Sequence, residues 1–366
     1  MISNDLVKEI IDEFPLIDEF KKDGKITKVG KYFQGICPKC KASATIINEN
    51  GLFKCLIGTC KAEGNVIDYI KYKNNISYRK AIEVFIKRNP KLKKTSAFVT
   101  NVSKTAITDA KRKKIIEINR EIQNFFVNQL AFSRANDARN YLVKKRNLSL
   151  STISDFGIGF VSNCDELINK LLKKYDKDLI MQTGIFSLKG RDLKGKLWNR
   201  ITFPITDEWN NIISFGGRVV DNSTPKYING SDSPIYNKRC HLYGLGKALE
   251  KSDTRKLDNI IVCEGYMDVI SMHQSGFTNC VASLGTALTM QQCHLLKDYT
   301  DVVYTAYDSD AAGTEASKKA GAILISAGLI VRRIDLSPYK DPDEFIKAKG
   351  RKALIERINK AKLIKQ

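Results

Sequence analysis

Short apolar runs in the C-terminal third of the sequence constrain the fold more than any other feature. They span residues 260–263, 280–282 and 302–305, and segments with helical periodicity separate them. Short strands that alternate with helices are typical of a parallel sheet with crossover helices on its faces. We therefore expect an α/β fold for this third of the chain.

Carboxylates follow these apolar runs. Glu264 comes directly after the first run, and Asp268 comes one helical turn later, so both can face one point. Asp308 and Asp310 follow the run at 302–305, and Asp341 and Asp343 follow a further run, "GLIVRRIDL". Three expected strand ends thus deliver the acids Glu264, Asp268, Asp308, Asp310, Asp341 and Asp343. The carboxyl ends of parallel strands meet at the edge where such sheets bind ligands. Because clustered carboxylates repel one another unless cations lie between them, the sequence predicts a magnesium or manganese site that could also hold substrate phosphates.

The charge balance points to a polyanionic partner. The chain has 61 Lys and Arg against 40 Asp and Glu, a net charge of +21. An anionic membrane is the rival to nucleic acid, but it would favour one basic amphipathic helix, whereas the basic residues here spread along the whole chain. No stretch has the length of a membrane span, and the N-terminus resembles an acidic amphipathic helix more than a secretory signal. We expect a cytoplasmic protein that binds nucleic acid and no membrane.

Four of the nine cysteines form a cluster near the N-terminus. "CPKC" spans residues 37–40, and Cys55 and Cys60 follow. The segment between the two pairs resembles a hairpin that turns at Asn50 and Gly51. Four thiolates at this spacing can surround zinc, whereas four unrelated buried cysteines would leave the spacing unexplained. We predict one structural zinc held by Cys37, Cys40, Cys55 and Cys60.

The organisation along the chain is heterogeneous. A stretch rich in Lys and Arg follows the cysteine module, helical periodicity begins near Ile115, and two β-rich runs between residues 197 and 220 predict an antiparallel hairpin. The overall fold class is α+β. The expected divisions are a zinc-binding domain at 1–88, a basic linker at 89–112, a mixed α+β subdomain at 113–255, the mainly parallel α/β domain at 256–346 and a C-terminal helix at 347–366.

Several of these segments together resemble a known family. "EGYMDVI", "ASLGTALT", "YDSDAAGTEA" and "KDPDEFI" look like the Toprim domain of bacterial DnaG-type primases. "CPKC" with "GNVIDYI" is similar to their zinc-binding domain, and "ARNYLVKKRNLS", "FGIGF", "RITFPI", "FGGRV", "TPKYIN" and "LYGL" are similar to the rest of their RNA polymerase domain. The resemblance spans most of residues 30–346.

The resemblance implies roles for particular residues. The six acids would bind one to three magnesium or manganese ions, with Glu264 also a candidate general base. The basic positions that would hold the template strand and nucleotide phosphates are Arg146, Arg200, Arg218, Lys226 and Lys238. Gly216 and Gly217 would let a backbone come close. Gly285 and Gly313 are better explained as turn or helix-start glycines.

Three departures from the family pattern affect the interpretation. Cys40 stands where the family usually has histidine, and the last cysteine pair is C-x4-C. Only 23 residues follow Asp343, which leaves no room for a helicase-binding domain, although a replicative helicase is a further conceivable partner. There is no phosphate-binding loop of a fused helicase. A compact phage, plasmid or mobile-element primase fits, and so does a truncated one.

The predicted function is that of a DNA primase, which joins nucleoside triphosphates into short RNA primers on single-stranded DNA. Two alternatives stay open. One is a Toprim nuclease, which would degrade DNA without triphosphates. The other is a non-catalytic DNA-binding replication adaptor, in which the acids would be structural.

Overall fold

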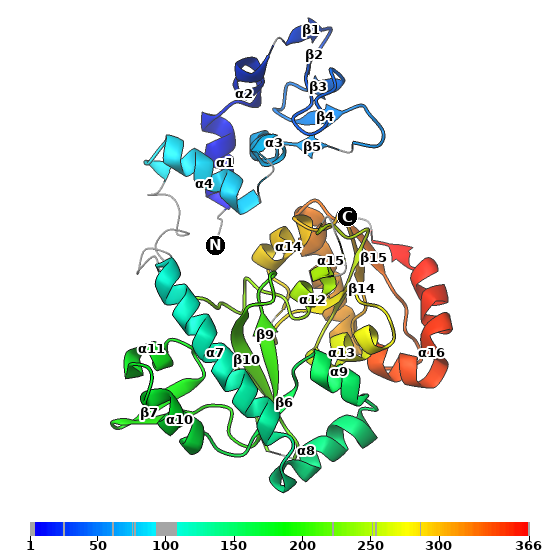
Figure 1. The fold of residues 1–366 in the computed structure, drawn as a ribbon. Coiled ribbons are helices and arrows are strands. Elements are labelled where there is room, and N and C mark those ends of the chain that lie inside the picture. The colour runs from blue at the N-terminus through cyan, green and yellow to red at the C-terminus, as the bar shows by residue number, and fades with distance from the viewer. Residues whose placement is uncertain are drawn as a thin grey trace. The chain divides into compact units, whose positions relative to one another are not determined.

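The computed structural model describes residues 4–24, 26–60, 62–74, 76, 78–92, 108–221, 223–250, 252, 255–285 and 287–364. The chain forms two compact units, Met1–Ala106 and Ile107–Gln366, and each has hydrophobic clusters of its own (Figure 1). The basic linker expected at 89–112 lies mostly outside the described residues, because 93–107 are not among them.

The first unit combines helices with an antiparallel sheet of five very short strands. Its helices are α1 (Asn4–Glu13), α2 (Leu16–Asp23), α3 (Val66–Asn74) and α4 (Tyr78–Arg88). Its strands, in sheet order, are β1 (Thr27–Val29), β2 (Tyr32–Gly35), β3 (Thr45–Ile47), β4 (Phe53–Cys55) and β5 (Glu63–Gly64). Leu6 and Ile10, four residues apart on α1, are fully buried, which confirms the amphipathic N-terminal helix. Strands β3 and β4 form the predicted hairpin, and Gly51 in its turn has φ +71°.

The second unit begins with helices and a four-stranded antiparallel sheet. Its sheet order is β11 (Tyr227–Asn229), β10 (Ile212–Val219), β9 (Arg200–Thr206) and β6 (Gly159–Val161). Strands β9 and β10 form the hairpin predicted between residues 197 and 220. The long helix α7 (Asp109–Gln129) packs on this sheet, where the ring centroids of Phe126 and Phe215 lie 5.3 Å apart.

Shorter elements complete this part of the unit. They are the helical turns η1 (Ser133–Ala135) and η2 (Tyr141–Lys145), the helices α8 (Asn136–Asn140), α9 (Leu150–Asp155), α10 (Asp165–Leu172), α11 (Lys177–Met181) and α12 (Leu245–Glu250), and the separate hairpin of β7 (Phe186–Lys189) and β8 (Asp192–Gly195).

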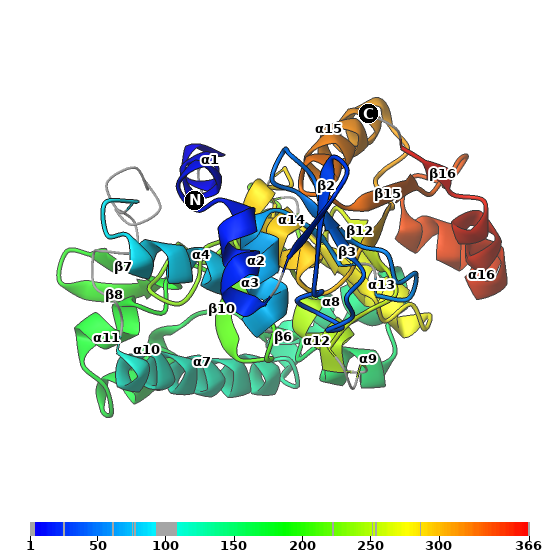
Figure 2. The same ribbon diagram turned by 90° about the horizontal axis from the view of Figure 1, so that it is seen from above.

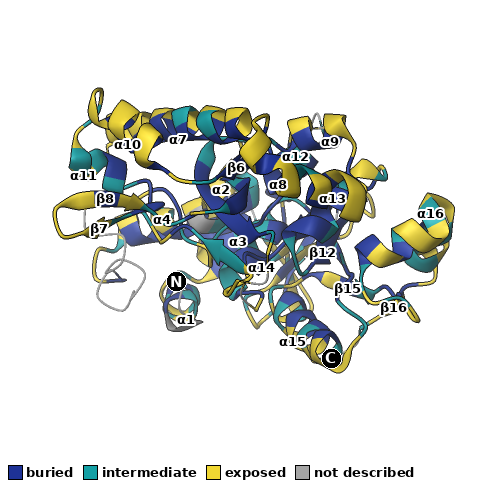
Figure 3. Ribbon diagram, turned by 90° about the horizontal axis from the view of Figure 1, so that it is seen from below, coloured by how far each residue is buried: buried dark blue, intermediate teal, exposed yellow. Residues whose placement is uncertain are grey.

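The C-terminal part confirms the α/β prediction. Strands β12 (Ile260–Cys263), β13 (Cys280–Ala282), β14 (Val302–Thr305) and β15 (Ile330–Arg333) are parallel, and the sheet order is β13-β12-β14-β15-β16. The helices between and after the strands are α13 (Tyr266–Gln274), α14 (Met290–Lys297), α15 (Ala311–Ser326) and α16 (Pro342–Asn359). Strand β12 is buried along its whole length, whereas the outer faces of α7 and α16 are exposed (Figure 3).

The end of the chain differs from the single helix expected at 347–366. Helix α16 starts earlier, because Asp341 caps it and Pro342 suits its first turn. It ends at Asn359, and β16 (Lys362–Leu363) then pairs antiparallel with β15. The last described residues therefore protect an edge of the parallel sheet.

Hydrophobic packing joins the two larger sheets of the second unit. One cluster contains residues of β9 together with residues of β12 and α13. Within it the rings of Phe203 and Tyr266 stack with their centroids 5.2 Å apart. Helices α7 and α16 lie at opposite ends of this unit (Figure 2). Among the described residues, no helix has the length and apolar character needed to cross a membrane.

Candidate active site and zinc centre

A cavity of about 670 Å³ lies in the second unit where strands β12 and β14 end. Its lining includes the acids Glu264, Asp268, Asp308 and Asp341. Four of the six acids that follow predicted strands are thus brought together, as expected for the carboxyl edge of a parallel sheet.

Backbone hydrogen bonds orient two of these acids. The Oε1 atom of Glu264 accepts a hydrogen bond of 3.0 Å from the backbone N–H of Asp308, which joins the ends of β12 and β14. The Oδ2 atom of Asp268, in the first turn of α13, accepts one of 3.1 Å from Gly265 N–H. The carboxylates are therefore held by the start of a helix and by a neighbouring strand end.

The electrostatics of the acidic wall favour positive charge. Burial, reinforced by the charges of Asp341 and Asp308, raises the pKa of Asp268 well above its usual value. Burial, followed by the charges of Glu264 and Asp341, raises the pKa of Asp308 to about 6. The neighbouring carboxylates thus make ionisation of Asp268 and Asp308 costlier, and a cation between them would reverse this effect.

The other two acids, Asp310 and Asp343, make contacts outside the cavity. Asp310 is exposed and caps α15, where its Oδ1 accepts a hydrogen bond of 2.8 Å from Gly313 N–H. Asp343 is 2% exposed, and its Oδ2 lies 2.7 Å from Arg146 Nη1 and 2.8 Å from Lys347 Nζ. Both lie outside the lining of the cavity. Sequence spacing could not reveal this difference, because it depends on which neighbour each side chain meets.

Basic side chains line the same cavity. Arg146, Arg218, Lys226 and Lys238 are among the lining residues, whereas Arg200 is buried behind them and donates a hydrogen bond of 3.3 Å to the backbone oxygen of Lys226. The charge of Arg218, followed by burial and the charge of Arg146, lowers the pKa of Lys226. The basic side chains are therefore close enough to repel one another, which is the condition for binding an anion.

Arg218 is held between aromatic rings. Its guanidinium lies 4.5 Å from the ring centroid of Tyr141 and 4.9 Å from that of Tyr227, and it donates a hydrogen bond to the hydroxyl of Tyr227. Its Nε is buried and has no hydrogen-bond partner among the described residues. The side chain is therefore fixed while part of its donor capacity is unused.

Sequence reasoning missed several residues of the site. Lys340 lines the cavity, and its Nζ lies 3.8 Å from Asp308 Oδ2; its position next to Asp341 could have indicated it. Tyr266 donates a hydrogen bond of 2.5 Å to Asn229 Oδ1, and Asn229 Nδ2 donates one of 2.8 Å to Leu284 O. This chain of contacts joins the antiparallel and parallel sheets across the cavity.

Gly216 and Gly217 on β10 lie against side chains of the protein itself. A Cβ atom at Gly216 would lie 2.6 Å from the hydroxyl oxygen of Tyr266, and one at Gly217 would lie 2.9 Å from Leu197 Cδ2. They make room for internal side chains, and neither glycine lines the cavity, so the close approach of a ligand backbone stays a prediction. Gly285, with φ +69°, and Gly313, in the first turn of α15, fit the turn and helix-start interpretation.

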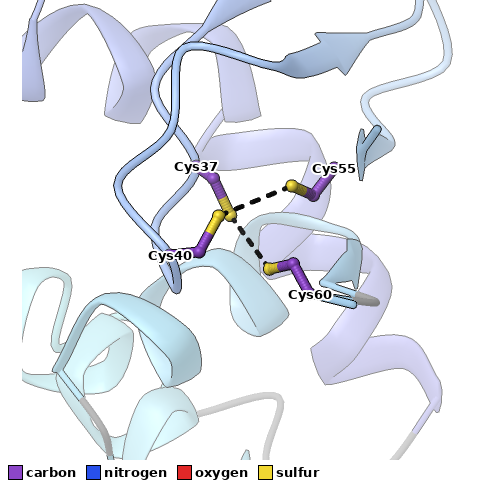
Figure 4. Close-up of side chains that lie close together, drawn as sticks. All are labelled: Cys37, Cys40, Cys55 and Cys60. Atoms are coloured by element: carbon purple, nitrogen blue, oxygen red, sulfur yellow. Dashed lines mark hydrogen bonds between the residues drawn. The ribbon is translucent and has the colours of Figure 1, made fainter. Parts of the chain in front are cut away.

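The zinc-binding cysteines form a compact cluster in the first unit. The Sγ atoms of Cys37, Cys40, Cys55 and Cys60 all lie within 4.8 Å of one another and point toward a common centre (Figure 4). The Cys37–Cys60 and Cys40–Cys55 sulfur distances are 3.6 and 3.7 Å. Tetrahedral zinc with Zn–S bonds of about 2.3 Å requires sulfur atoms roughly 3.8 Å apart. The donor set and its geometry therefore fit a structural zinc ion.

Within the described ranges, this cysteine cluster is the one group of three or more possible ligand side chains gathered so tightly. The carboxylates of the cavity are spaced more widely. Their oxygen donors suit magnesium or manganese, which usually keep waters or substrate phosphates in their shells.

Family comparisons cover most of the chain. Residues 2–121 match the CHC2 zinc finger, residues 125–249 match the N-terminal domain of the DNA primase catalytic core, and residues 261–346 match a Toprim-like domain.

Curated relatives are longer than this chain. The DNA primase of Clostridium acetobutylicum is 31% identical over 99% of this chain and 59% of the relative. That of Haemophilus influenzae is 29% identical over 100% of this chain and 62% of the relative. The chain therefore spans less than two thirds of the length of these relatives.

Solved structures agree with these matches. The zinc-binding and RNA polymerase domains of the Aquifex aeolicus primase are 28% identical, with a TM-score of 0.64 over 99% of this chain and 86% of theirs. A DnaG primase catalytic domain bound to single-stranded DNA is 31% identical, with a TM-score of 0.63 over 70% of this chain and 81% of its own. The resemblance drawn from the sequence motifs is confirmed, and the chain belongs to the DnaG-type family of DNA primases.

Proposed function

We propose that this protein synthesises short RNA primers on a single-stranded DNA template by metal-dependent nucleotidyl transfer. One observation carries the proposal: a single cavity has an acidic wall suited to divalent cations and a basic wall suited to phosphates. The family membership and the single-stranded DNA bound by a related catalytic domain support it.

The acids that line the cavity are the proposed cation ligands. Glu264, Asp308 and Asp341 offer carboxylate oxygens, and Asp268 places a further carboxyl group beside them. Magnesium or manganese bound there would neutralise charge on the triphosphate. Asp310 and Asp343 have the cap and ion-pair contacts described above, so we propose supporting roles for them.

The basic wall binds and orients the polyanions. Arg218 is fixed between Tyr141 and Tyr227, so its guanidinium loses little freedom when it binds a phosphate. Lys226, Lys238 and Arg146 provide further positive charge in the same cavity. Arg200 supports this wall through the backbone of Lys226. We assign these residues to the template strand and the incoming nucleoside triphosphate.

Glu264 is the proposed general base for the attacking 3′ hydroxyl. Its carboxylate lines the cavity, and the N–H of Asp308 fixes its orientation. A base must reach the proton that it removes, and the position of Glu264 at the cavity wall supports this role.

The remaining assignments follow the family pattern. We propose the domain divisions 1–88, 89–112 and 113–255, a last domain that starts at 256 and includes α16 and β16, and a role for the zinc-binding domain in selecting the initiation site. Interaction with a replicative helicase stays a prediction.

Primer synthesis by wild-type protein and the Glu264→Gln variant tests the proposal. Single-stranded DNA, labelled ribonucleoside triphosphates and magnesium or manganese should give template-dependent oligonucleotides. Glu264→Gln should reduce the rate at least about 100-fold, because it removes both a cation ligand and the proposed base. The matched control is Glu315→Gln, which alters an exposed glutamate on α15.

Three outcomes would count against the proposal. Degradation of DNA without triphosphates would indicate a Toprim nuclease. Binding of DNA without any synthesis would indicate an adaptor. Normal synthesis by Glu264→Gln would refute the proposed base.

A further inference from the structure

Trp198 is the most exposed aromatic side chain near the candidate active site. It lies in the loop between β8 and β9, and 65% of it is exposed. The preceding residue, Leu197, is 1% exposed and packs over Gly217 on β10. The loop is thus anchored by one apolar residue while the next one faces solvent. One exposed apolar side chain is ordinary by itself, so the neighbours of Trp198 decide what it can bind.

Residues on both sides of Trp198 donate hydrogen bonds to residues that line the cavity. Before it, Lys196 Nζ donates a hydrogen bond of 2.6 Å to Ser231 Oγ. After it, Arg200 Nη1 donates one of 3.3 Å to Lys226 O. Ser231 and Lys226 both line the cavity, at either end of the segment that contains β11. Trp198 is therefore held next to the rim of the cavity and outside its lining.

Basic residues are frequent near Trp198 in the sequence. The basic residues of the β7–β8 hairpin and the following loop are Lys189, Arg191, Lys194, Lys196 and Arg200. Asp192 is the acid among them, and Lys189, Arg191 and Lys194 are exposed. An exposed aromatic ring among positive charges is the combination that binds single-stranded nucleic acid, because bases stack on the ring and phosphates bind the cations. A dry protein interface would instead favour a larger apolar patch with fewer lysines.

We propose that Trp198 stacks on a base of a single nucleic-acid strand that leaves the cavity across β11. This inference rests on the proposed function of the cavity. The strand is either the DNA template or the RNA product, and both offer the same base faces. Trp198 would position the strand without taking part in the chemistry.

The second tryptophan of the chain provides a matched control. The sequence contains two tryptophans, and Trp209 lies in the turn between β9 and β10, at the other end of the hairpin. It is 62% exposed, and the guanidinium of Arg255 lies 5.9 Å from its ring centroid. The seven residues of β9 separate the two positions by roughly 20 Å. A strand that stacks on Trp198 at the rim need not touch Trp209.

Tryptophan fluorescence tests the contact directly. Trp209→Phe leaves Trp198 as the sole tryptophan, and Trp198→Phe leaves Trp209. In the full zinc-bound chain, single-stranded oligo(dT) or oligo(rU) should quench the emission of Trp209→Phe and leave that of Trp198→Phe nearly unchanged. Stronger quenching by oligo(dT) would assign the site to the template, and stronger quenching by oligo(rU) would assign it to the product.

A binding measurement provides the energetic counterpart. Trp198→Ala should weaken binding of a fluorescent oligonucleotide about 10-fold by anisotropy, Trp198→Phe should restore most of the affinity, and Trp209→Ala should have no effect.

Other results would overturn the inference. Unquenched Trp198 emission with tight oligonucleotide binding would reject stacking, leave the primase proposal intact and indicate a protein contact at Trp198. Equal quenching by duplex DNA would also reject stacking, because paired bases do not expose their faces. Failure of wild-type protein to bind any single strand would reject both proposals.

Discussion

Asp308 is the acid of the cavity whose raised pKa is most easily tested by experiment. Its backbone N–H orients Glu264, and its carboxylate lies 3.8 Å from Lys340 Nζ. Even with this lysine nearby, burial and the neighbouring acids raise its pKa to about 6. The residue thus titrates close to neutral pH, and a bound cation would shift it toward the ionised form.

Replacing Asp308 by Asn should stabilise the zinc-bound protein at pH 7 when no magnesium or manganese is added. The folded state binds the Asp308 proton more tightly than the unfolded state, so this acid lowers the free energy of unfolding as pH rises from about 4 through 6. We expect Asp308→Asn to gain about 2 kcal/mol at pH 7 and almost nothing at pH 4, measured by urea denaturation. A gain of the same size at both pH values would contradict the assigned pKa. The variant should at the same time lose primer synthesis.

One buried carboxylate links helix α16 to the N-terminal part of the second unit through an ion pair. Asp343, on its first turn, pairs with Arg146 just after the helical turn η2. Arg146 Nε also donates a hydrogen bond of 2.6 Å to the Tyr141 hydroxyl. The ion pair therefore sets the position of a basic side chain that lines the cavity.

Asp343→Asn should destabilise the protein and weaken nucleotide binding together. The change removes the negative partner of Arg146 and Lys347, and breaking such a partly buried pair costs about 2 kcal/mol. Chemical denaturation should show this loss, and the KM for nucleoside triphosphates should rise more than kcat falls. Glu356→Gln, an exposed change on the same helix, should alter neither quantity. An unchanged KM in a destabilised variant would restrict Asp343 to a structural role.

The elements differ in how well the sequence predicted them. Strands β12 and β13 are buried, so their residues are continuously apolar and easily recognised, and β14 alternates between intermediate and buried residues. Strands β5 and β16 have two residues each, and their extended form depends on pairing with β4 and β15, which no local pattern encodes. The same contrast between local pattern and tertiary contacts applies to the candidate active site. Position after a strand predicted Glu264 and Asp308 in the cavity, but the partners of Asp343 arise from tertiary packing.

At the scale of the whole molecule, both units have apolar clusters, but the first unit has in addition a set of possible metal ligands. The second unit has large apolar clusters. The first has strands of two to four residues and a cysteine cluster at the end of β4. A small module with such short strands depends strongly on its metal.

Removal of zinc should therefore unfold the first unit and leave the second folded. Cys55→Ser should abolish stoichiometric zinc, measured by elemental analysis, and eliminate one of two thermal transitions. Cys240→Ser, a cysteine outside the cluster, should retain both zinc and the transition. Loss of the complete fold in Cys55→Ser would show that the units are not independent.

The charges of the candidate active-site cavity come from two different halves of the second unit. The acids follow strands of the parallel sheet, whereas Arg218 and Lys226 belong to β10 and to the chain just before β11. The electric field inside such a hollow has a definite direction. A growing polynucleotide also has a direction, from its 5′ to its 3′ end. In only one orientation can its 3′ hydroxyl face the carboxylates while its phosphates contact Arg218 and Lys226.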